Sequence, residues 1–192
     1  MIVWVNGAFG AGKTTLTTEL HSRRPDALLY DPEPLGIILR EIVDDPTGDF
    51  QDLRLWRRQL VSLALGLLEE YERPLLVPMT LVDPVCMGEV FGALAAADVT
   101  VHHFFLDVPA DVLYRRLDAR AVALGHPEGD PDGSRWAKDR VARCVAAAET
   151  MPVGTVFLDG ERPTPELADE VLKHVPVPVR DRGRGSGPSP VR

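Results

Sequence analysis

The feature that most constrains the fold is the stretch at residues 2–15, IVWVNGAFGAGKTT, where a short apolar run leads into a glycine-rich turn. The spacing of Gly7, Gly12, Lys13 and Thr14 fits the phosphate-loop pattern G-x-x-x-x-G-K-[ST]. The run before Gly7 alternates as a strand does, and the residues after the loop have the pattern of a helix. A strand, a glycine-rich loop and a helix in this order predict a P-loop nucleotide-binding domain.

Each residue type in this loop suits one part of a nucleoside triphosphate. Glycines leave the backbone able to aim several N–H groups at one anion. Lys13 adds a positive charge beside the β- and γ-phosphates, which makes it a binding and a catalytic candidate, and Thr14 offers a hydroxyl to Mg²⁺. The expected cofactors are therefore ATP and Mg²⁺. The loop residues expected to bind ATP are Gly7, Ala8, Phe9, Gly10, Ala11, Gly12, Lys13, Thr14 and Thr15.

Composition and charge indicate one α/β domain, at residues 1–175, followed by a Pro/Gly/Arg-rich tail at 176–192 that we expect to be disordered. Of the 192 residues 45% are hydrophobic, and the formal charge of −8 argues against nucleic acid as a partner. The N-terminus lacks a basic signal region, and no run of 18 apolar residues occurs, so no integral membrane segment is expected. We expect a cytoplasmic monomer or homodimer that binds a small molecule.

Five apolar runs are expected to form a parallel sheet. They lie at residues 2–7, 27–30, 74–81, 100–108 and 154–158, and helical patterns separate them. Right-handed crossovers favour placing the run at 74–81 beside the first strand. The expected fold is an α/β three-layer sandwich of the P-loop NTPase class, with about five parallel strands.

Two carboxylates follow the second expected strand, where an open α/β sheet binds its ligands. Asp31 is predicted to accept a proton from an acceptor hydroxyl or to hold Mg²⁺, and Glu33 is the second candidate for the same work. Asp is also a common helix N-cap, so a purely capping role for Asp31 stays open.

An arginine-rich segment resembles the lid of a small kinase. Arg116 and Arg120 lie four residues apart on one helix face without an acid four residues from either, so an anion from outside the helix should neutralise them. Residues 124–134 have the composition of a loop, and a helix expected at 135–149 adds Arg143. We expect these three arginines to close over ATP, with Arg120 catalytic, and the loop at Gly160 to pass beside the purine. The alternative is a solvated basic face.

His102 and His103 are adjacent in the fourth expected strand, and two histidines suggest a metal site. Neighbouring strand residues point to opposite faces, so the two imidazoles cannot chelate one ion together. They are interpreted as packing residues.

These motifs together resemble the bacterial tunicamycin-resistance proteins, small phosphate-loop proteins grouped with the nucleoside and nucleotide kinases. The resemblance spans most of residues 1–175. It rests on VNGAFGAGKT at 5–14, YDPE at 30–33, Gly36, Arg40, DFQ at 49–51, LWR at 55–57, VPMT at 77–80, VHHF at 101–104, Arg116-Leu117, Arg120-Ala121, Trp136-Ala137 and Arg143-Cys144-Val145. It implies a kinase-like fold, ATP binding and a role in resistance to a uridine-containing antibiotic.

Substrate contacts are expected near the start of the helix that follows Asp49, where such folds admit substrate, although its apolar stripe belongs to the core. The residues expected to bind the substrate are Asp31, Glu33, Arg40, Gln51, Trp56, Arg57 and Thr80. The leading hypothesis is an ATP- and Mg²⁺-dependent phosphotransferase acting on a hydroxyl of a nucleoside-like or antibiotic molecule. The alternative is an ATP-binding protein that sequesters its ligand, or an ATPase switch, without phosphoryl transfer.

Overall fold

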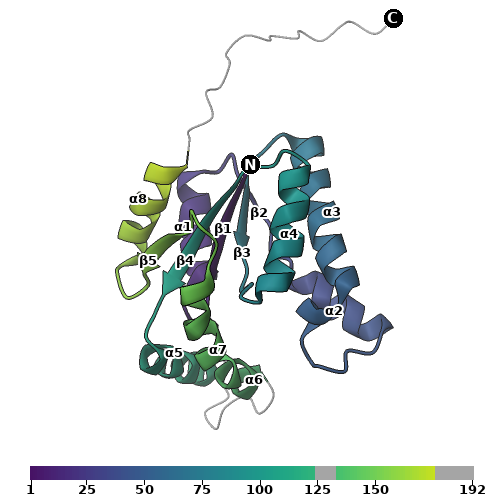
Figure 1. Ribbon diagram of the computed structural model, residues 1–192. Helices are drawn as coiled ribbons and strands as arrows, with labels where there is room; N and C mark the ends of the chain where they lie inside the picture. The colour runs from purple at the N-terminus through teal and green to yellow at the C-terminus, as the bar shows by residue number, and fades with distance from the viewer. Residues whose placement is uncertain (124–132, 176–192) are drawn as a thin grey trace, which may run out of the picture.

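The computed structural model describes residues 1–123 and 133–175, and a single parallel sheet forms its centre. The strands are β1 (Ile2–Gly7), β2 (Leu28–Leu29), β3 (Leu75–Pro78), β4 (Val101–Asp107) and β5 (Val156–Asp159). Their spatial order is β2-β3-β1-β4-β5 (Figure 1), and each neighbouring pair is parallel. The predicted five-stranded parallel sheet, with β3 beside β1, is confirmed.

Helices cover both faces of this sheet. They are α1 (Lys13–Arg23), α2 (Glu33–Ile42), α3 (Arg54–Tyr71), α4 (Pro84–Ala96), α5 (Ala110–Ala123), α6 (Gly133–Asp139), α7 (Val141–Ala146) and α8 (Thr164–His174), with 3₁₀ turns η1 (Phe50–Asp52) and η2 (Ala147–Thr150). In Figure 1, α1 and α8 lie on one side of the sheet and α3 and α4 on the other. The three-layer sandwich is thus confirmed. None of the helices that the structure describes is long and apolar enough to cross a bilayer.

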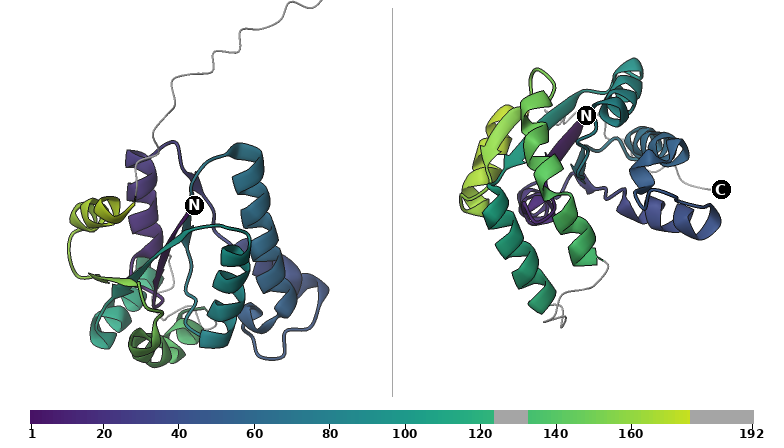
Figure 2. Two further views of the ribbon diagram at one scale, coloured as in Figure 1. Left: turned by 45° about the horizontal axis from the view of Figure 1, so that its top comes forward. Right: turned by 60° about the horizontal axis from the view of Figure 1, so that its bottom comes forward.

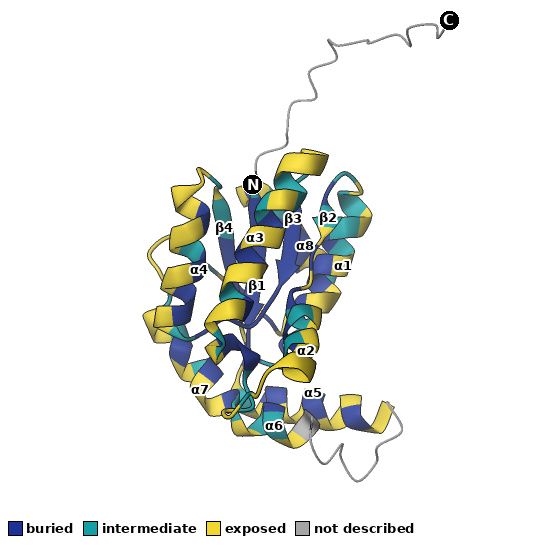
Figure 3. Cartoon of the chain, turned by 90° about the vertical axis from the view of Figure 1, so that its right-hand side faces the viewer, coloured by how far each residue is buried: buried dark blue, intermediate teal, exposed yellow. Residues whose placement is uncertain are grey.

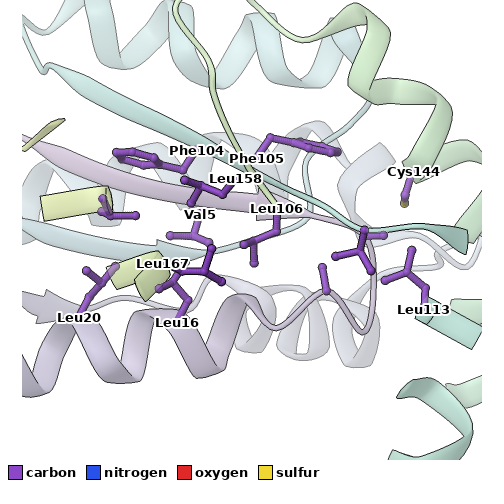
Figure 4. Packing of buried hydrophobic residues seen from close by; sticks show 14 of the residues in the cluster. Val5, Leu16, Leu20, Phe104, Phe105, Leu106, Leu113, Cys144, Leu158 and Leu167 are labelled. Atoms are coloured by element: carbon purple, nitrogen blue, oxygen red, sulfur yellow. The ribbon is translucent and has the colours of Figure 1, made fainter. Parts of the chain in front are cut away.

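Side chains of β1 alternate between the two faces of the sheet, and this explains why helices must cover both faces. Val3 and Val5 pack into the core beneath α1 and α8, whereas Ile2 and Trp4 pack into a second core beneath α3 and α4. Figure 4 shows Val5 beside Leu16 and Leu167. A strand that is apolar on both faces is stable only between two helix layers. Figure 3 shows the strands buried between helices whose outer surfaces are exposed.

The third strand is shorter than the expected 74–81, because side chains replace its backbone ladder after the Met79 N–H, which still donates to the Val5 carbonyl at 3.1 Å. Trp4 Nε1 donates to the Met79 carbonyl at 3.2 Å, and the Asn6 side chain bonds both the N–H and the C=O of Leu81. The chain therefore leaves β1 at the level of the phosphate loop.

The segment expected as one helix at 135–149 is divided into α6, α7 and η2. The division falls at Arg140, whose N–H donates to the Ala137 carbonyl in the manner of a tight turn. Helices α5, α6 and α7 gather at the carboxyl edge of the sheet, which the right-hand view of Figure 2 turns toward the viewer. Residues 124–132 of the loop predicted at 124–134, and the predicted tail, 176–192, lie outside the described residues. The last two residues of that predicted loop, 133–134, begin α6 instead.

Candidate functional site

The phosphate loop joins β1 to α1 and has the backbone that its glycines permit. Gly10 and Gly12 have φ values of 82° and 102°, in the left-handed region that side chains disfavour. Gly7 has φ 139°, and a Cβ built there would lie 2.9 Å from the Leu106 carbonyl oxygen. These positions admit glycine alone without strain, and the loop wraps toward the first turn of α1, where Thr14 and Thr15 are exposed.

Lys13 is buried within this loop rather than extended into solvent. Its Nζ donates to the Ala8 carbonyl at 2.9 Å and to the Gly7 carbonyl at 3.2 Å. Burial lowers the pKa of its ammonium to about 8, against an opposing effect of the Glu33 carboxylate. Among the residues that the structure describes, the ammonium is hydrogen-bonded to carbonyl oxygens and to no carboxylate, so a bound phosphate would supply a negatively charged partner.

The lowered pKa of Lys13 predicts that ATP binding weakens at alkaline pH. Phosphate oxygens raise the pKa of the ammonium in the complex, so ATP binds the protonated form better. The affinity should be insensitive to this group below its unliganded pKa of about 8 and fall by up to about tenfold per pH unit above it. ATP titrations between about pH 7 and pH 9.5 measure this, with Lys13→Ala as the control. A slope that persists in Lys13→Ala would assign the titration to another group.

A cavity of about 400 Å³ opens beside the loop. It is lined by Phe9, Glu33, Arg40, Gly48, Phe50, Gln51, Met79 and Trp136. Phe9 belongs to the phosphate loop, so this loop forms part of the cavity wall. Its size suits a small organic molecule, and its mixture of aromatic and polar groups is typical of a ligand pocket.

The two predicted carboxylates occupy different positions at this cavity. Glu33 lines it and is half-buried; burial raises the pKa of its carboxyl, and the charge of Asp31 adds to that effect, while Lys13 and Arg120 oppose it. Asp31 is exposed, and its Oδ1 accepts the Glu33 backbone N–H at 3.0 Å. That bond closes a local turn ahead of α2, but the N-cap of α2 is Pro32, which has no side-chain cap hydrogen bond, so Asp31 does not have the capping role left open by the sequence. Oδ2 of Asp31 has no hydrogen bond to the described residues.

Phe50 forms one wall of the cavity and rests on Gly36 of α2. A Cβ at Gly36 would lie 2.3 Å from Cγ of Phe50, which also packs against Trp56 and under the Arg40 guanidinium. The ring is held on three sides and cannot withdraw freely.

Gly36→Ala is therefore expected to destabilise the protein by about 1–3 kcal/mol, because the ring must shift from a packed position. Gly66→Ala is the matched control, since Gly66 lies within α3 with nothing within 4 Å of the added Cβ. That control should be neutral or gain up to about 1 kcal/mol from helix propensity. Urea unfolding of both variants measures the difference. Equal stabilities would show that Phe50 repacks at no cost.

The other predicted substrate residues support the cavity in different ways. Gln51 lines it and donates from Nε2 to the Thr80 carbonyl at 2.9 Å. Thr80 is buried, and its hydroxyl donates to the Gly7 carbonyl at 2.8 Å. Arg57 pairs with Glu89 at 2.8 Å, and its Nη1 donates to the Gln51 carbonyl. Trp56 is fully buried, and its indole N–H donates to the Pro32 carbonyl. It therefore supports the segment at 31–33, which carries the two carboxylates, and does not line the cavity.

The three predicted lid arginines differ in their partners. Arg116 donates to the Ala11 carbonyl at 3.3 Å and to the Gly160 carbonyl at 2.9 Å, so it joins the phosphate loop to the loop after β5. Arg143 pairs with Asp83 at 3.0 Å. Arg120 is exposed and forms no ion pair with a residue that the structure describes, although its charge acts on both Lys13 and Glu33.

Trp136 is a site residue that the sequence analysis left without a role. From α6 its indole N–H donates to the Gly48 carbonyl at 3.0 Å, and its ring meets Phe9 edge-to-face at 5.0 Å. The Arg140 guanidinium lies 3.8 Å from the ring centroid and pairs with Asp49 at 3.6 Å. Helix α6 is thus tied to the loop between α2 and η1. The only sequence signal for Trp136 was the Trp136-Ala137 pair in the resemblance to the tunicamycin-resistance proteins.

A family model described as an AAA domain matches residues 2–145 of this chain. The chain belongs to the AAA domain family. Among solved structures it is similar to the tunicamycin resistance protein of Deinococcus radiodurans, with 25% identity, a TM-score of 0.68, and coverage of 90% of this chain and 94% of that one. The resemblance to tunicamycin-resistance proteins is therefore confirmed for this AAA domain protein.

Two kinases are also similar to this AAA domain protein. The APS kinase CysC of Mycobacterium tuberculosis, solved in complex with AMPPNP and APS, has a TM-score of 0.60 and 20% identity, covering 90% of this chain and 95% of that one. Human nicotinamide riboside kinase 2 is 32% identical over 95 residues, which are 50% of this chain and 40% of that protein. The chain thus spans less than half of that curated relative. The similarity to the APS kinase shows a P-loop kinase-like fold, and such a fold implies nucleotide binding.

Proposed function

We propose that the protein is a kinase that transfers the γ-phosphate of ATP to a hydroxyl of a nucleoside-like or antibiotic small molecule, in tunicamycin-type resistance. The observation that carries the proposal is the cavity of about 400 Å³ that shares Phe9 with the phosphate loop and has Glu33 in its wall. Phosphoryl transfer depends on positioning and on charge stabilisation, so a donor site and an acceptor site must touch. The kinases among the similar proteins support the same conclusion.

The donor side is formed by the loop and the lid arginines. The loop from Gly7 to Thr15 and the Lys13 ammonium bind the phosphates, through N–H groups of the loop other than that of Gly7, which Asn6 holds. Arg116 and Gly160 border the purine. Arg120 stabilises the charge on the transferred phosphoryl group, and Arg143 exchanges Asp83 for the nucleotide.

Thr14 and Asp31 are the proposed Mg²⁺ ligands. A hydroxyl and a carboxylate are oxygen donors of the kind Mg²⁺ prefers, and both residues are exposed at the same edge of the sheet. Bound there, Mg²⁺ neutralises charge on the phosphates.

On the acceptor side, Asp31 accepts the hydroxyl proton, and Glu33, Arg40 and Gln51 orient the acceptor. Thr80 and Arg57 hold Gln51 in place through the contacts described above, and Trp56 holds the carboxylate segment. We assign these functions to residues 1–175, acting in the cytoplasm as a monomer or homodimer.

The deciding experiment incubates the protein with ATP, Mg²⁺ and either tunicamycin or a series of plain nucleosides, and examines the small molecules by mass spectrometry. The expected result is a gain of one phosphate on one of them, which Lys13→Ala loses. Tight binding of a candidate with no change in its mass would favour sequestration. ATP hydrolysis without a phosphorylated product would favour an ATPase switch.

A further inference from the structure

A network of hydrogen bonds, buried around Asn6, runs across the sheet beneath the phosphate loop. Asn6 is fully buried at the end of β1, directly before Gly7. Its Oδ1 accepts the N–H of Gly7 at 2.8 Å and the N–H of Leu81 at 3.0 Å. Its Nδ2 donates to the Leu81 carbonyl at 2.6 Å and lies 3.1 Å from Nε2 of His103. The side chain thus joins β1 to the chain after β3 and to β4.

These partners determine where every proton lies. Two backbone N–H groups converge on one atom of the Asn6 amide, so that atom is the oxygen and the other is the nitrogen. One N–H of the amide is used on Leu81, and the second points at His103, so Nε2 of His103 must accept. In a neutral imidazole the proton then sits on Nδ1, which lies 2.8 Å from Oγ1 of Thr155.

The hydrogen bonds of Thr155, at the far end of this network, agree with the assignment of the protons. The Thr155 hydroxyl donates to the Pro152 carbonyl at 2.8 Å, so its oxygen is left to accept from Nδ1 of His103. Burial lowers the pKa of His103 to about 4, which keeps the ring neutral. A second proton, on Nε2, would face the amide N–H of Asn6, so geometry alone disfavours the charged form.

We propose that His103 is a positioning residue for the phosphate loop, because its Nε2 holds the Asn6 amide in the orientation that anchors Gly7. Asn6 binds the N–H of Gly7, while Lys13 and Thr80 bind the Gly7 carbonyl. Both peptide groups of this glycine, whose φ is 139°, are thereby held at the entrance of the loop. The inference rests on the proposed binding of ATP by this loop.

Removing the acceptor at position 103 leaves one N–H of the Asn6 amide buried without a partner. The amide can recover a hydrogen-bond partner only by rotating or by admitting a water molecule. Either change disturbs the bond to Gly7. His103→Phe removes both ring nitrogens while keeping an aromatic ring against Phe91, which meets the imidazole edge-to-face at 5.1 Å. We expect His103→Phe to weaken ATP binding by about tenfold.

Two further variants separate positioning from general stability. His103→Gln supplies a carbonyl oxygen in place of Nε2 and should restore most of the ATP affinity. Thr155→Val removes the bond at Nδ1 and the bond to the Pro152 carbonyl but leaves Nε2 of His103 in place, so it should lower the melting temperature and leave the ATP dissociation constant within about twofold of wild type. ATP affinity is measured by calorimetry with AMPPNP as the probe, and therefore without any acceptor or turnover.

The outcomes are distinguishable from failure of the proposed function. Wild-type protein that binds no AMPPNP would overturn the proposed function and this inference with it. Normal AMPPNP affinity in His103→Phe would overturn the inference alone, as would an equal loss of affinity in Thr155→Val and His103→Phe.

A measurement on the wild-type protein keeps the inference testable should His103→Phe not fold. Nitrogen NMR of the His103 ring should show a protonated Nδ1 and an unprotonated Nε2 at neutral pH. A proton on Nε2 would overturn the assignment, because Nε2 could then not accept from Asn6.

Discussion

Asp31→Asn is expected to lower kcat by about 10²- to 10⁴-fold while changing stability little. The amide keeps an oxygen for the Glu33 backbone N–H, which Oδ1 of Asp31 accepts at 3.0 Å, so the local turn survives. It cannot take a proton from an acceptor hydroxyl, so the loss falls on turnover. Initial rates at saturating ATP, together with thermal unfolding, measure both quantities.

Glu33→Gln is the matched comparison, because it removes the other carboxylate of the segment. Glu33 lines the cavity, and burial raises the pKa of its carboxyl, so it is placed to orient an acceptor. The expected result is a higher KM for the acceptor with a smaller effect on kcat. If instead Glu33→Gln abolished turnover and Asp31→Asn did not, the general base would be Glu33. Normal transfer in both variants would favour sequestration.

Arg120→Ala is expected to lower kcat by about 10³-fold. The guanidinium is exposed on α5, and its charge acts on the pKa values of both Lys13 and Glu33, so it lies within electrostatic reach of both groups. Among the described residues it has no ion-pair partner, so its charge is available to the phosphoryl group as negative charge develops there.

Arg115→Ala provides the control on the same helix. Arg115 is exposed as well, but it pairs with Asp111 one turn away at 2.6 Å. Losing a solvent-exposed pair of this kind should leave kcat unchanged and cost less than about 1 kcal/mol of stability. Unchanged ATP affinity and turnover in Arg120→Ala would return the arginines of α5 to a solvated basic face.

The sequence by itself determined the phosphate loop, the parallel sheet and the order of helices and strands. These depend on local spacing: glycines at fixed intervals, short runs with the pattern of a strand, and helical stripes between strands. The carboxylates also followed from sequence, because any residue just after a parallel strand lies at the carboxyl edge. The third strand was predicted too long because Asn6 replaces its ladder with side-chain bonds.

Only the tertiary structure decided which of these residues meet. Trp136 lies 88 positions from Gly48, and His103 lies 97 from Asn6, yet each pair is hydrogen-bonded. Such bonds depend on which strands are neighbours and on how the lid helices return over the sheet, and no local pattern encodes either. The same holds for Lys13: its sequence spacing predicted a phosphate-binding lysine, but the burial that lowers its pKa comes from the packing of the loop around it.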